Sequence, residues 1–557
     1  MPQAIIDNLE KIDNALENVT VADPAVGSGA FPLGMLNEIV KARSIIVEYM
    51  TKDLIEWQKE DFIRDNKRDL YNLKKDAMKK SIFAVDIEPS AVDITKLRLW
   101  LSLVVDSDVK TVNTLPNLDY NIMVGNSLID EYEGIKLFDE ELLKDKPKRR
   151  IENKSSQIRY EFGKDNDLIG IGIEQEQEIL ENIQNLQYEL FDEKNTKRKI
   201  QIKDEIENKE WELIEYKLLK DNKKEEFKKL EKTRSENRKP YFLWKMNFSK
   251  IFKEKGGFDI VIGNPPYGAK LEKKQKESIK NKLKNTNNLN TASIFIDYAK
   301  NQWRNKEGII SYIVPKSLLY SESWYSLIES MIKNMKEIID VEKAFENVKL
   351  EQVVFVYNSK ENINQYRAKK FLNNTFIKDT MISIDSVYKL KACICDITKE
   401  EVDIIKKLDN DKFIEMKEIS TTKRGIGIQK LVNEKGQVAV LGGKNLYKFG
   451  IDGIYGKINN EDLEKNLKKL KFMKQPKIIT QDIIAHIQNP KPHILITSVF
   501  DEEGKVLTLD TCQNTVLINN NYDYRYILGL LNSEFISWYT YKFIYCSAIR
   551  TMHFDKY

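Results

Sequence analysis

Residues 21–31 read Val-Ala-Asp-Pro-Ala-Val-Gly-Ser-Gly-Ala-Phe, a short apolar strand that runs into a glycine loop and then into a helix. The helical pattern continues to Ala42. Gly27 and Gly29 allow a tight turn and a close backbone approach to a ligand, and the free N–H groups of the helix start lie just beyond. The loop lacks the Lys-Ser/Thr of a phosphate-binding loop and the third glycine of the dinucleotide pattern, so it favours a nucleoside without a polyphosphate.

Apolar runs of strand length alternate with helical patterns after this loop. We expect strands at 82–86, 120–124, 259–262, 308–314, 338–341 and 353–357, and helices at 90–103, 291–302 and 321–336. This alternation predicts an α/β fold with a doubly wound parallel sheet.

Polar side chains follow two of these strands. Asp86 ends the strand at 82–86, where a carboxylate can accept hydrogen bonds from both hydroxyls of a ribose. Asn126 follows the strand at 120–124 with an amide that can read an adenine edge. Alone, each residue is an ordinary turn cap. Together with the glycine loop, at successive strand ends, they predict a nucleoside site.

A further strand pattern, at 258–263, ends in Asn264-Pro265-Pro266-Tyr267. The two prolines remove two backbone donors, so the carbonyl groups here face outward without a strand neighbour. A planar amino-heterocycle can donate its N–H groups to the Asn264 side-chain oxygen and the Pro265 carbonyl while its ring stacks on Tyr267. The alternative is a rigid strand exit with a surface tyrosine. The nucleoside site predicted upstream favours the interpretation of this tetrapeptide as a site for an amino-heterocycle.

The chain has 557 residues, enough for several domains, and 32% of them are charged, above the usual quarter. Residues 131–240 account for the excess, with 28 acidic and 25 basic side chains among 110 positions. Apolar residues recur there at helical spacing, which predicts a solvated helical hairpin that projects from the domain. An arm that clamps DNA or binds a partner is the alternative.

Several classes of protein are excluded by composition. No apolar run approaches the ~20 residues of a membrane span, and the start lacks a signal segment, so we expect a cytoplasmic protein without membrane contact. Four cysteines in so long a chain do not form a disulfide framework, and with only three histidines we expect no metal site.

These segments resemble the AdoMet-dependent N6-adenine DNA methyltransferases, specifically the long multidomain members found in type IIG restriction-modification enzymes and related phage-defence systems. The motifs occur in the family's order, and the similarity covers nearly the whole chain. The resemblance implies a Rossmann-like domain that binds S-adenosyl-L-methionine (AdoMet). The cofactor-binding residues that it implies are Asp23, Pro24, Ala25, Gly27, Ser28, Gly29, Phe31, Asp86, Ile87, Asn126 and Leu128.

Within this set the resemblance implies that residues 23–31 wrap the methionine part of AdoMet, Asp86 holds the ribose, Ile87 packs on the adenine and Asn126 reads it. The family often has Asp where Asn126 stands, and an amide oxygen can still accept the adenine N–H.

The same resemblance makes Asn264, Pro265, Pro266 and Tyr267 the catalytic residues. They would hold N6 of an adenine that has been flipped out of the duplex, because stacking in the duplex blocks the required geometry. Phe345 offers a second stacking face, but a core phenylalanine is the favoured interpretation.

The resemblance divides the chain into four regions. They are an AdoMet-binding part (1–130), the charged helical insertion (131–240), a catalytic part (241–395) and a mixed α/β target-recognition domain (396–557). Residues 421–500 carry 14 basic and 6 acidic side chains, an excess that suits double-stranded DNA. The expected DNA-binding residues are Lys423, Arg424, Lys444, Lys474 and Gln481, although a solvated lysine face is the alternative for any one of them.

Two departures from the family stand at the ends of the chain. It begins at Met1, shortly before the glycine loop, without the usual upstream AdoMet motif or nuclease domain, and it ends at Tyr557 inside what resembles the recognition domain. We therefore expect a piece of a longer enzyme, with the nuclease on a separate chain or domain and no nuclease activity of its own. Three rival functions remain. They are a non-catalytic DNA-specificity or scaffold protein, a protein-glutamine methyltransferase, which would be far shorter, and a full restriction enzyme that cuts DNA with magnesium.

Overall fold

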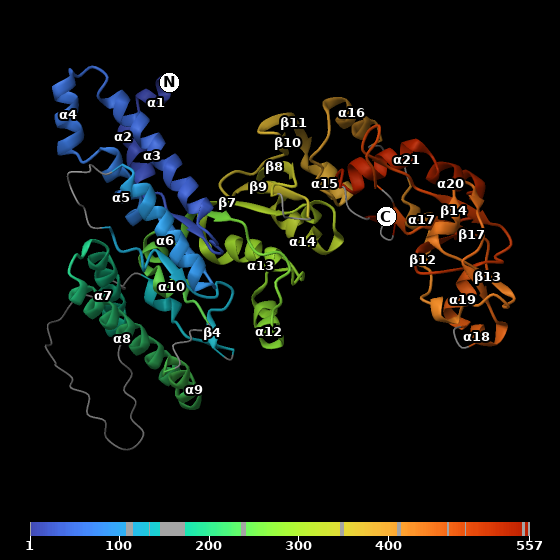
Figure 1. Cartoon of the computed structure of the whole chain (residues 1–557), viewed down its shortest axis with the longest axis horizontal. Helices are drawn as coiled ribbons and strands as arrows, with labels where there is room; N and C mark the ends of the chain where they lie inside the picture. The colour runs from blue at the N-terminus through green and yellow to red at the C-terminus, as the bar shows by residue number, and fades with distance from the viewer. Residues whose placement is uncertain are drawn as a thin grey trace. The chain divides into compact units, whose positions relative to one another are not determined.

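The structure, a computed structural model of the whole chain, describes residues 2–106, 115–132, 134–144, 173–235, 241–345, 350–408, 414–464, 467–484, 486–548 and 552–554. The chain divides into two compact units (Figure 1). The first unit comprises Met1–Val314 and Val354–Asn362, and the second comprises Pro315–Val353 and Ile363–Tyr557. Within the described ranges, no helix is long and apolar enough to cross a membrane.

The first unit is built on a largely parallel sheet. Its strands follow the order β9 (Gln352–Asn358), β7 (Arg304–Pro315), β6 (Phe258–Gly263), β1 (Val21–Asp23), β2 (Ile82–Asp86) and β3 (Ile122–Val124). Every neighbouring pair from β7 to β3 is parallel. The inner strands are short and apolar because both faces are covered, and Val21, Ala22 and Val261 are almost fully buried. The predicted α/β fold is confirmed.

Four helices of the first unit pack together (Figure 1). They are α2 (Leu9–Asn18), α3 (Ala30–Met50), α5 (Leu70–Lys80) and α6 (Pro89–Val104). Arg43 of α3 is 3% exposed and bonds to Asp13 of α2 at 3.0 Å and to Asp76 of α5 at 3.1 Å. A buried guanidinium is tolerated only with such partners, so these ion pairs fix how the three helices meet.

An aromatic cluster covers the start of β6. The ring of Phe258 lies 5.8 Å from Trp244, 5.5 Å from Phe248 and 5.8 Å from Phe252, measured between ring centroids. Trp244 and Phe252 belong to the short helices α10 (Trp244–Asn247) and α11 (Ser249–Lys255), and Phe248 lies between these helices. The remaining elements of this unit are α1 (Gln3–Ile6), α4 (Glu56–Asp65), β4 (Glu131–Tyr132), β5 (Ile135–Lys136), α12 (Lys273–Lys282) and α13 (Thr291–Tyr298).

The charged insertion is helical where it is described. It contains α7 (Ile173–Asp192), α8 (Thr196–Lys220) and α9 (Lys224–Ser235), and Asn195 caps α8 by accepting from the backbone N–H of Lys197 at 2.9 Å. The expectation that this hairpin projects freely from the domain is wrong for α7. Phe191 enters the sheet core, and Gln184 donates to Ser249 of α11 at 2.9 Å.

The two ends of the insertion meet. The backbone N–H of Phe242 donates to the carbonyl of Ile129 at 2.7 Å. The Phe242 ring also lies so close to Gly125 that a Cβ there would be 2.4 Å from it. The chain therefore leaves the sheet after β3 and returns to the same point before β6.

The second unit contains further strands in several groups. Strand β8 (Met335–Glu342) runs parallel to β10 (Gln365–Leu372), which forms an antiparallel hairpin with β11 (Thr375–Ser383). A four-stranded antiparallel sheet follows the order β12 (Ser420–Arg424), β23 (Cys512–Leu517), β17 (Lys477–Gln481) and β21 (Ser498–Asp501). A three-stranded sheet has the order β16 (Gly456–Ile458), β13 (Val438–Leu441) and β22 (Leu507–Thr508). The main helices of the second unit are α14 (Glu322–Met331), α15 (Ile384–Leu390), α16 (Lys399–Leu408) and α19 (Leu467–Met473).

Near its end the chain forms two helices, α20 (Tyr524–Leu531) and α21 (Glu534–Tyr539). The break between them is caused by two polar residues. Asn532 is buried and makes paired 2.9 Å bonds with the backbone N–H and carbonyl of Ser498. Ser533 then caps α21 by accepting from the N–H of Ile536 at 3.1 Å.

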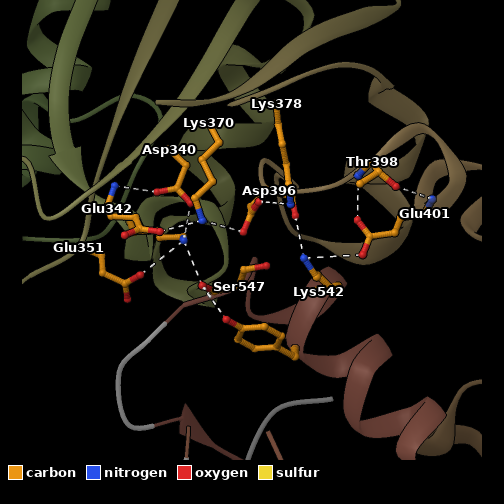
Figure 2. A network of polar contacts seen from close by, with 12 residues as sticks. Asp340, Glu342, Glu351, Lys370, Lys378, Asp396, Thr398, Glu401, Lys542 and Ser547 are labelled. Carbon is orange, nitrogen blue, oxygen red and sulfur yellow. Dashed lines mark hydrogen bonds and ion pairs between the residues drawn. The ribbon is translucent and has the colours of Figure 1, made fainter. Parts of the chain in front are cut away.

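A network of polar contacts joins distant segments of the second unit (Figure 2). The side chain of Lys316 is 3% exposed, and its ammonium group lies 2.8 Å from the carboxylate of Asp340 and 3.2 Å from the carbonyl of Ser547. Asp340 is fully buried. Nearby, Asp396 accepts from Lys370 at 3.1 Å, and its backbone carbonyl accepts from Lys542 at 3.1 Å. Lys316 and Asp396 are thus both bonded to residues near the end of the chain.

We expect Lys316→Met to destabilise the second unit by about 3–5 kcal/mol, because it leaves the Asp340 carboxylate buried without its cation. Lys360→Met is the control, since Lys360 pairs with Glu307 at 3.1 Å while both side chains are about two-thirds exposed, and its loss should cost less than about 1 kcal/mol. Chemical denaturation of the three proteins measures the difference. Equal effects of the two substitutions would contradict a structural role for the buried pair.

Candidate functional site

The parallel strands of the first unit bring the predicted site residues to one edge of the sheet. The register sets Asp23 opposite Ala84 and Ala22 opposite Val261. Strand β2 in turn sets Asp86 opposite Val124. Asp23, Asp86, Asn126 and Asn264 therefore all stand at or just after the carboxyl ends of neighbouring strands, where ligands bind in folds of this kind.

The glycine loop after β1 is held open by its neighbours. Gly27 has a φ of +53°, and no atom lies within 4 Å of the position that a Cβ would take. Its N–H donates to the Asp86 carboxylate at 2.7 Å, and its carbonyl accepts from Thr95 at 3.1 Å. Gly29, with a φ of +80°, leaves only 2.8 Å between a Cβ and the Thr95 side chain. Gly29 therefore has no room for a side chain, whereas Gly27 has a left-handed φ that favours glycine and leaves free space beside the backbone.

Further contacts tie the loop to the segment after β3. The hydroxyl of Ser127 donates to the carbonyl of Pro24 at 2.7 Å. The side-chain oxygen of Asn126 accepts from the N–H of Leu128 at 3.2 Å, which leaves one lone pair of that oxygen for a ligand. These bonds join the loop after β1 to the segment after β3, two strand ends that the sequence predicts to lie together.

The predicted cofactor residues differ in exposure. Ile87 is 61% exposed, so its side chain is available to pack on a ligand. Ser28 is also exposed, and its carbonyl accepts from Arg98 at 2.9 Å. Pro24 is buried, while Ala25 and Phe31 are half-buried. Leu128 is only 5% exposed and contributes to the wall beneath the loop.

Asp23 is a buried acid with one unpaired oxygen. Its Oδ1 accepts from the N–H of Ala25 at 3.1 Å, whereas no described residue donates to its Oδ2. Burial raises the pKa of Asp23 to about 8, so the group is largely neutral at pH 7. The hydroxyl of Tyr312, also buried, has no partner among the described residues either, and its pKa is raised by burial and by the nearby charge of Asp23.

Gly263 connects Asp23 to the Asn-Pro-Pro-Tyr segment. A Cβ at Gly263 would lie 2.6 Å from Oδ1 of Asp23, so only glycine lets β1 and β6 approach this closely. The next residue is Asn264. The acid of the glycine loop and the amide of the tetrapeptide are therefore neighbours across two adjacent strands.

The tetrapeptide itself is clamped. The hydroxyl of Tyr267 lies 2.5 Å from Oδ1 of Asn264 and 2.9 Å from the carbonyl of Ile313 in β7. The Thr291 hydroxyl donates to the carbonyl of Pro266 at 2.5 Å. Among the described residues, none donates to the carbonyl of Pro265, which remains available to a ligand. Sequence reasoning had assigned Tyr267 only a stacking role and had not identified Thr291, Ile313 or Tyr312.

The interpretation of Phe345 as a core residue is wrong. Its side chain is 43% exposed, so it is not a core residue. The residue lies in the second unit, directly before the undescribed residues 346–349.

The expected DNA-binding residues lie in the second unit. Strand β23 pairs with the ends of both β12 and β17, with Arg424 opposite Gln513 and Gln481 opposite Cys512. A Cβ at Gly443 would be 3.3 Å from the Gln481 side chain, so the turn that carries Lys444 reaches the same end of the sheet. Three of the five residues are thus gathered together.

The other two lie apart from this group. The ammonium of Lys423 sits 4.5 Å from the centre of the Phe472 ring, on the face opposite to Arg424 because neighbouring side chains of a strand alternate. Lys474 stands before β17, at the end opposite to Gln481.

Two family models match the chain. Residues 80–346 match the Eco57I restriction-modification methylases, and residues 438–557 match the TaqI-like C-terminal specificity domains. The first match contains Asp86, Asn126 and Asn264. The second contains Gln481 but begins after Arg424.

Curated relatives include a protein of Methanocaldococcus jannaschii named as a type II restriction enzyme and methyltransferase, RM.MjaORFECS2P. It is 26% identical over 98% of this chain and 47% of its own length. The type II methyltransferase M.VspI of a Vibrio species is 28% identical over 16% of this chain and 22% of its own length. The chain spans about half the length of the first relative and less of the second.

Solved structures with a similar course include the type IIL restriction-modification enzyme MmeI in complex with DNA, with a TM-score of 0.48 and 10% identity over 95% of this chain and 61% of that one. Another is a nuclease-deletion mutant of the type ISP enzyme LlaGI with a DNA substrate mimic, with a TM-score of 0.42 and 11% identity over 99% and 45% of the two chains. Residues 80–346 thus match an Eco57I-type restriction-modification methylase region, and residues 438–557 match a TaqI-like C-terminal specificity domain.

Proposed function

We propose that this protein transfers the methyl group of AdoMet to N6 of an adenine in double-stranded DNA, at a sequence chosen by the second unit. The observation that carries the proposal is the pair of acceptors at Asn264 and Pro265, placed beside the acid of the glycine loop. The family matches support a restriction-modification methylase with a specificity domain.

The chemistry follows from the nature of an adenine amine. Its N6 lone pair is delocalised into the ring, so the amine is a weak nucleophile. Hydrogen bonds from the two N–H groups to Asn264 Oδ1 and the Pro265 carbonyl favour a tetrahedral nitrogen with a localised lone pair. The lone pair then forms the N–C bond while the C–S bond of the donor breaks, its electrons stay on sulfur, and one N–H proton leaves to solvent.

Tyr267 has two tasks in this proposal. Its ring stacks on the flipped base and so recovers part of the few kcal/mol that flipping costs. Its hydroxyl, 2.5 Å from Asn264 Oδ1 and 2.9 Å from the Ile313 carbonyl, fixes the direction of the amide. An amide oxygen has two lone pairs, so Asn264 Oδ1 can accept from the Tyr267 hydroxyl and also from the amine.

The strand-end residues fit AdoMet. AdoMet supplies an electrophilic methyl group when it is bound. Gly27 leaves space beside the backbone, the Asp86 carboxylate is oriented by the Gly27 N–H and retains lone pairs for ribose hydroxyls, and the exposed Ile87 offers an apolar face. The unpaired Oδ2 of Asp23 suits the ammonium group of the methionine part.

The roles of the remaining parts are also proposals. Residues in the second unit would bind the DNA, and a nuclease domain or chain would be a partner, since the chain spans about half of a relative named as both restriction enzyme and methyltransferase. Incubation with DNA and labelled AdoMet, followed by nucleoside mass spectrometry, tests the reaction. Label in N6-methyladenine supports it, whereas label in protein glutamine or none at all overturns it.

We expect Asn264→Ala and Tyr267→Ala each to reduce methyl transfer by about 10²- to 10³-fold, because each removes a group that positions the amine. Tyr267→Phe keeps the ring and should lose about tenfold or less, which separates stacking from the hydroxyl clamp. Single-turnover rates with a saturating DNA substrate give the comparison. Wild-type turnover in Asn264→Ala and Tyr267→Ala would contradict the assignment, and AdoMet affinity should persist in all three variants.

We expect AdoMet binding at pH 7 to release a proton from Asp23. The raised pKa of about 8 keeps the free carboxyl largely neutral, and a bound ammonium group favours its ionised form. The release should fade above pH 8, where Asp23 is already ionised. Titration calorimetry in buffers of different ionisation enthalpy measures it.

Asp23→Asn should abolish this proton release, and Asp259→Asn is its control. Asp259 lies at the opposite end of β6, and although burial opposes its ionisation, bonds from Lys255 and Thr20 lower its pKa. Release that survives in Asp23→Asn would contradict the assignment.

A further inference from the structure

A fully buried carboxylate lies beneath the surface of the second unit. Asp482 follows β17 and is 0% exposed. Its Oδ1 accepts from Nε2 of Gln513 at 2.7 Å, and its Oδ2 lies 2.8 Å from Nδ1 of His553 and 3.2 Å from Nη2 of Arg424. One buried acid therefore orients three polar side chains from three different strands.

Arg424 is held at two points and remains 48% exposed. Besides the Nη2 contact with Asp482, its Nε donates to the backbone carbonyl of Asp510 at 2.6 Å. A guanidinium has five N–H groups in one plane. The two contacts use the Nε hydrogen and one Nη2 hydrogen. The second Nη2 hydrogen and both Nη1 hydrogens are left as a flat, outward donor fork.

The surroundings of this fork are polar and contain an exposed aromatic ring. Gln429 donates to the carboxylate of Asp510 at 2.7 Å. Gln481 lies against Gly443, and the ring of Tyr455, which is 52% exposed, lies against Gly442. The sheet end thus presents an anchored arginine among amides, beside an aromatic ring and the exposed Lys444.

Stability alone does not account for this arrangement. Burial of a carboxylate costs several kcal/mol in lost hydration, and a half-exposed arginine returns little of it because water screens the pair. The arrangement does remove rotational freedom from Arg424. A pre-oriented guanidinium loses less entropy on binding and discriminates better between acceptor geometries.

We propose that Arg424 reads a guanine in the major groove of the DNA target, and that Asp482 is the positioning residue that holds it. A guanine offers two acceptors, O6 and N7, that match the Nη1 and Nη2 fork, and this is the commonest specific pairing of arginine with a base. The inference rests on the proposed function, since it assigns part of the target sequence. A contact to a phosphate is the competing outcome.

The test selects bound duplexes from a randomised DNA library with the full chain and sequences them, so that no methyl transfer is required. The wild type should enrich one sequence with a fixed guanine. Arg424→Ala should lower discrimination at that position roughly 5- to 150-fold, the range that a bidentate base contact supplies, and leave the other positions unchanged. Arg424→Lys keeps the charge but loses the fork, so it should relax the same position with less loss of affinity.

Asp482→Asn examines the positioning role. It should relax the same base position to a smaller extent, because the amide oxygen still accepts one bond. Arg525→Ala is the matched control, since Arg525 is 69% exposed in the same unit and pairs with Glu502 at 2.9 Å. The control should leave the selected sequence unchanged, and thermal denaturation confirms that the variants fold.

Each outcome separates the hypotheses. Uniform weakening at all positions in Arg424→Ala assigns the arginine to a phosphate and overturns the inference. An unchanged sequence in both Arg424 variants also overturns it, as does a wild type that selects no sequence. Selection of a guanine-containing sequence without any methylated adenine would leave the inference standing and reject the proposed methyl transfer.

Discussion

The candidate site depends on the parallel register of β1 against its two neighbours. Because Ala22 pairs with Val261 and Asp23 with Ala84, the acid of the glycine loop stands between the strand that leads to Asn264 and the strand that ends at Asp86. A shift by one residue would turn Asp23 to the other face of the sheet. Gly263 permits this approach, since no larger residue fits against the carboxylate. The glycine loop and the tetrapeptide are thus held at adjacent strand ends.

The buried charges of the protein fall into two kinds. Arg43 and Lys316 are surrounded by carboxylates and join elements that are distant in sequence, so their partners are satisfied within the fold. Asp23 is equally buried, but one of its oxygens has no partner among the described residues, and Asp482 bonds to Arg424 and His553, whose side chains are partly exposed. A charge that is fully paired inside stabilises a junction. A charge that is left unpaired, or that serves an exposed group, points to a ligand.

Much of this was readable from the sequence. Short β-branched runs and helical periods gave the α/β class, and polar residues after strand ends located Asp86, Asn126 and Asn264. Local patterns could not show contacts between distant segments. Examples are the bond of the Tyr267 hydroxyl to Asn264, the close approach of Gly263 to Asp23, and the bonds of Asp482 to three side chains from other strands. The helical pattern of residues 524–542 predicts one helix near the end of the chain, but this helix is broken because Asn532 bonds to Ser498, a tertiary effect that local periodicity cannot show. The prediction of a freely projecting hairpin was wrong for α7 for the same reason, because α7 contacts segments that are distant in sequence.

The meeting of Ile129 with Phe242 has an evolutionary consequence. A segment whose entry and exit are bonded to each other is a closed loop. Its length affects the stability of the sheet only through the entropy of loop closure, which changes slowly with loop length. Helices can be added to or removed from such a loop while β3 and β6 keep their places. Relatives of this protein can therefore differ widely in length between these strands and still share the same strand-end geometry. The charged helices are a place where new partners can be acquired without rebuilding the candidate active site.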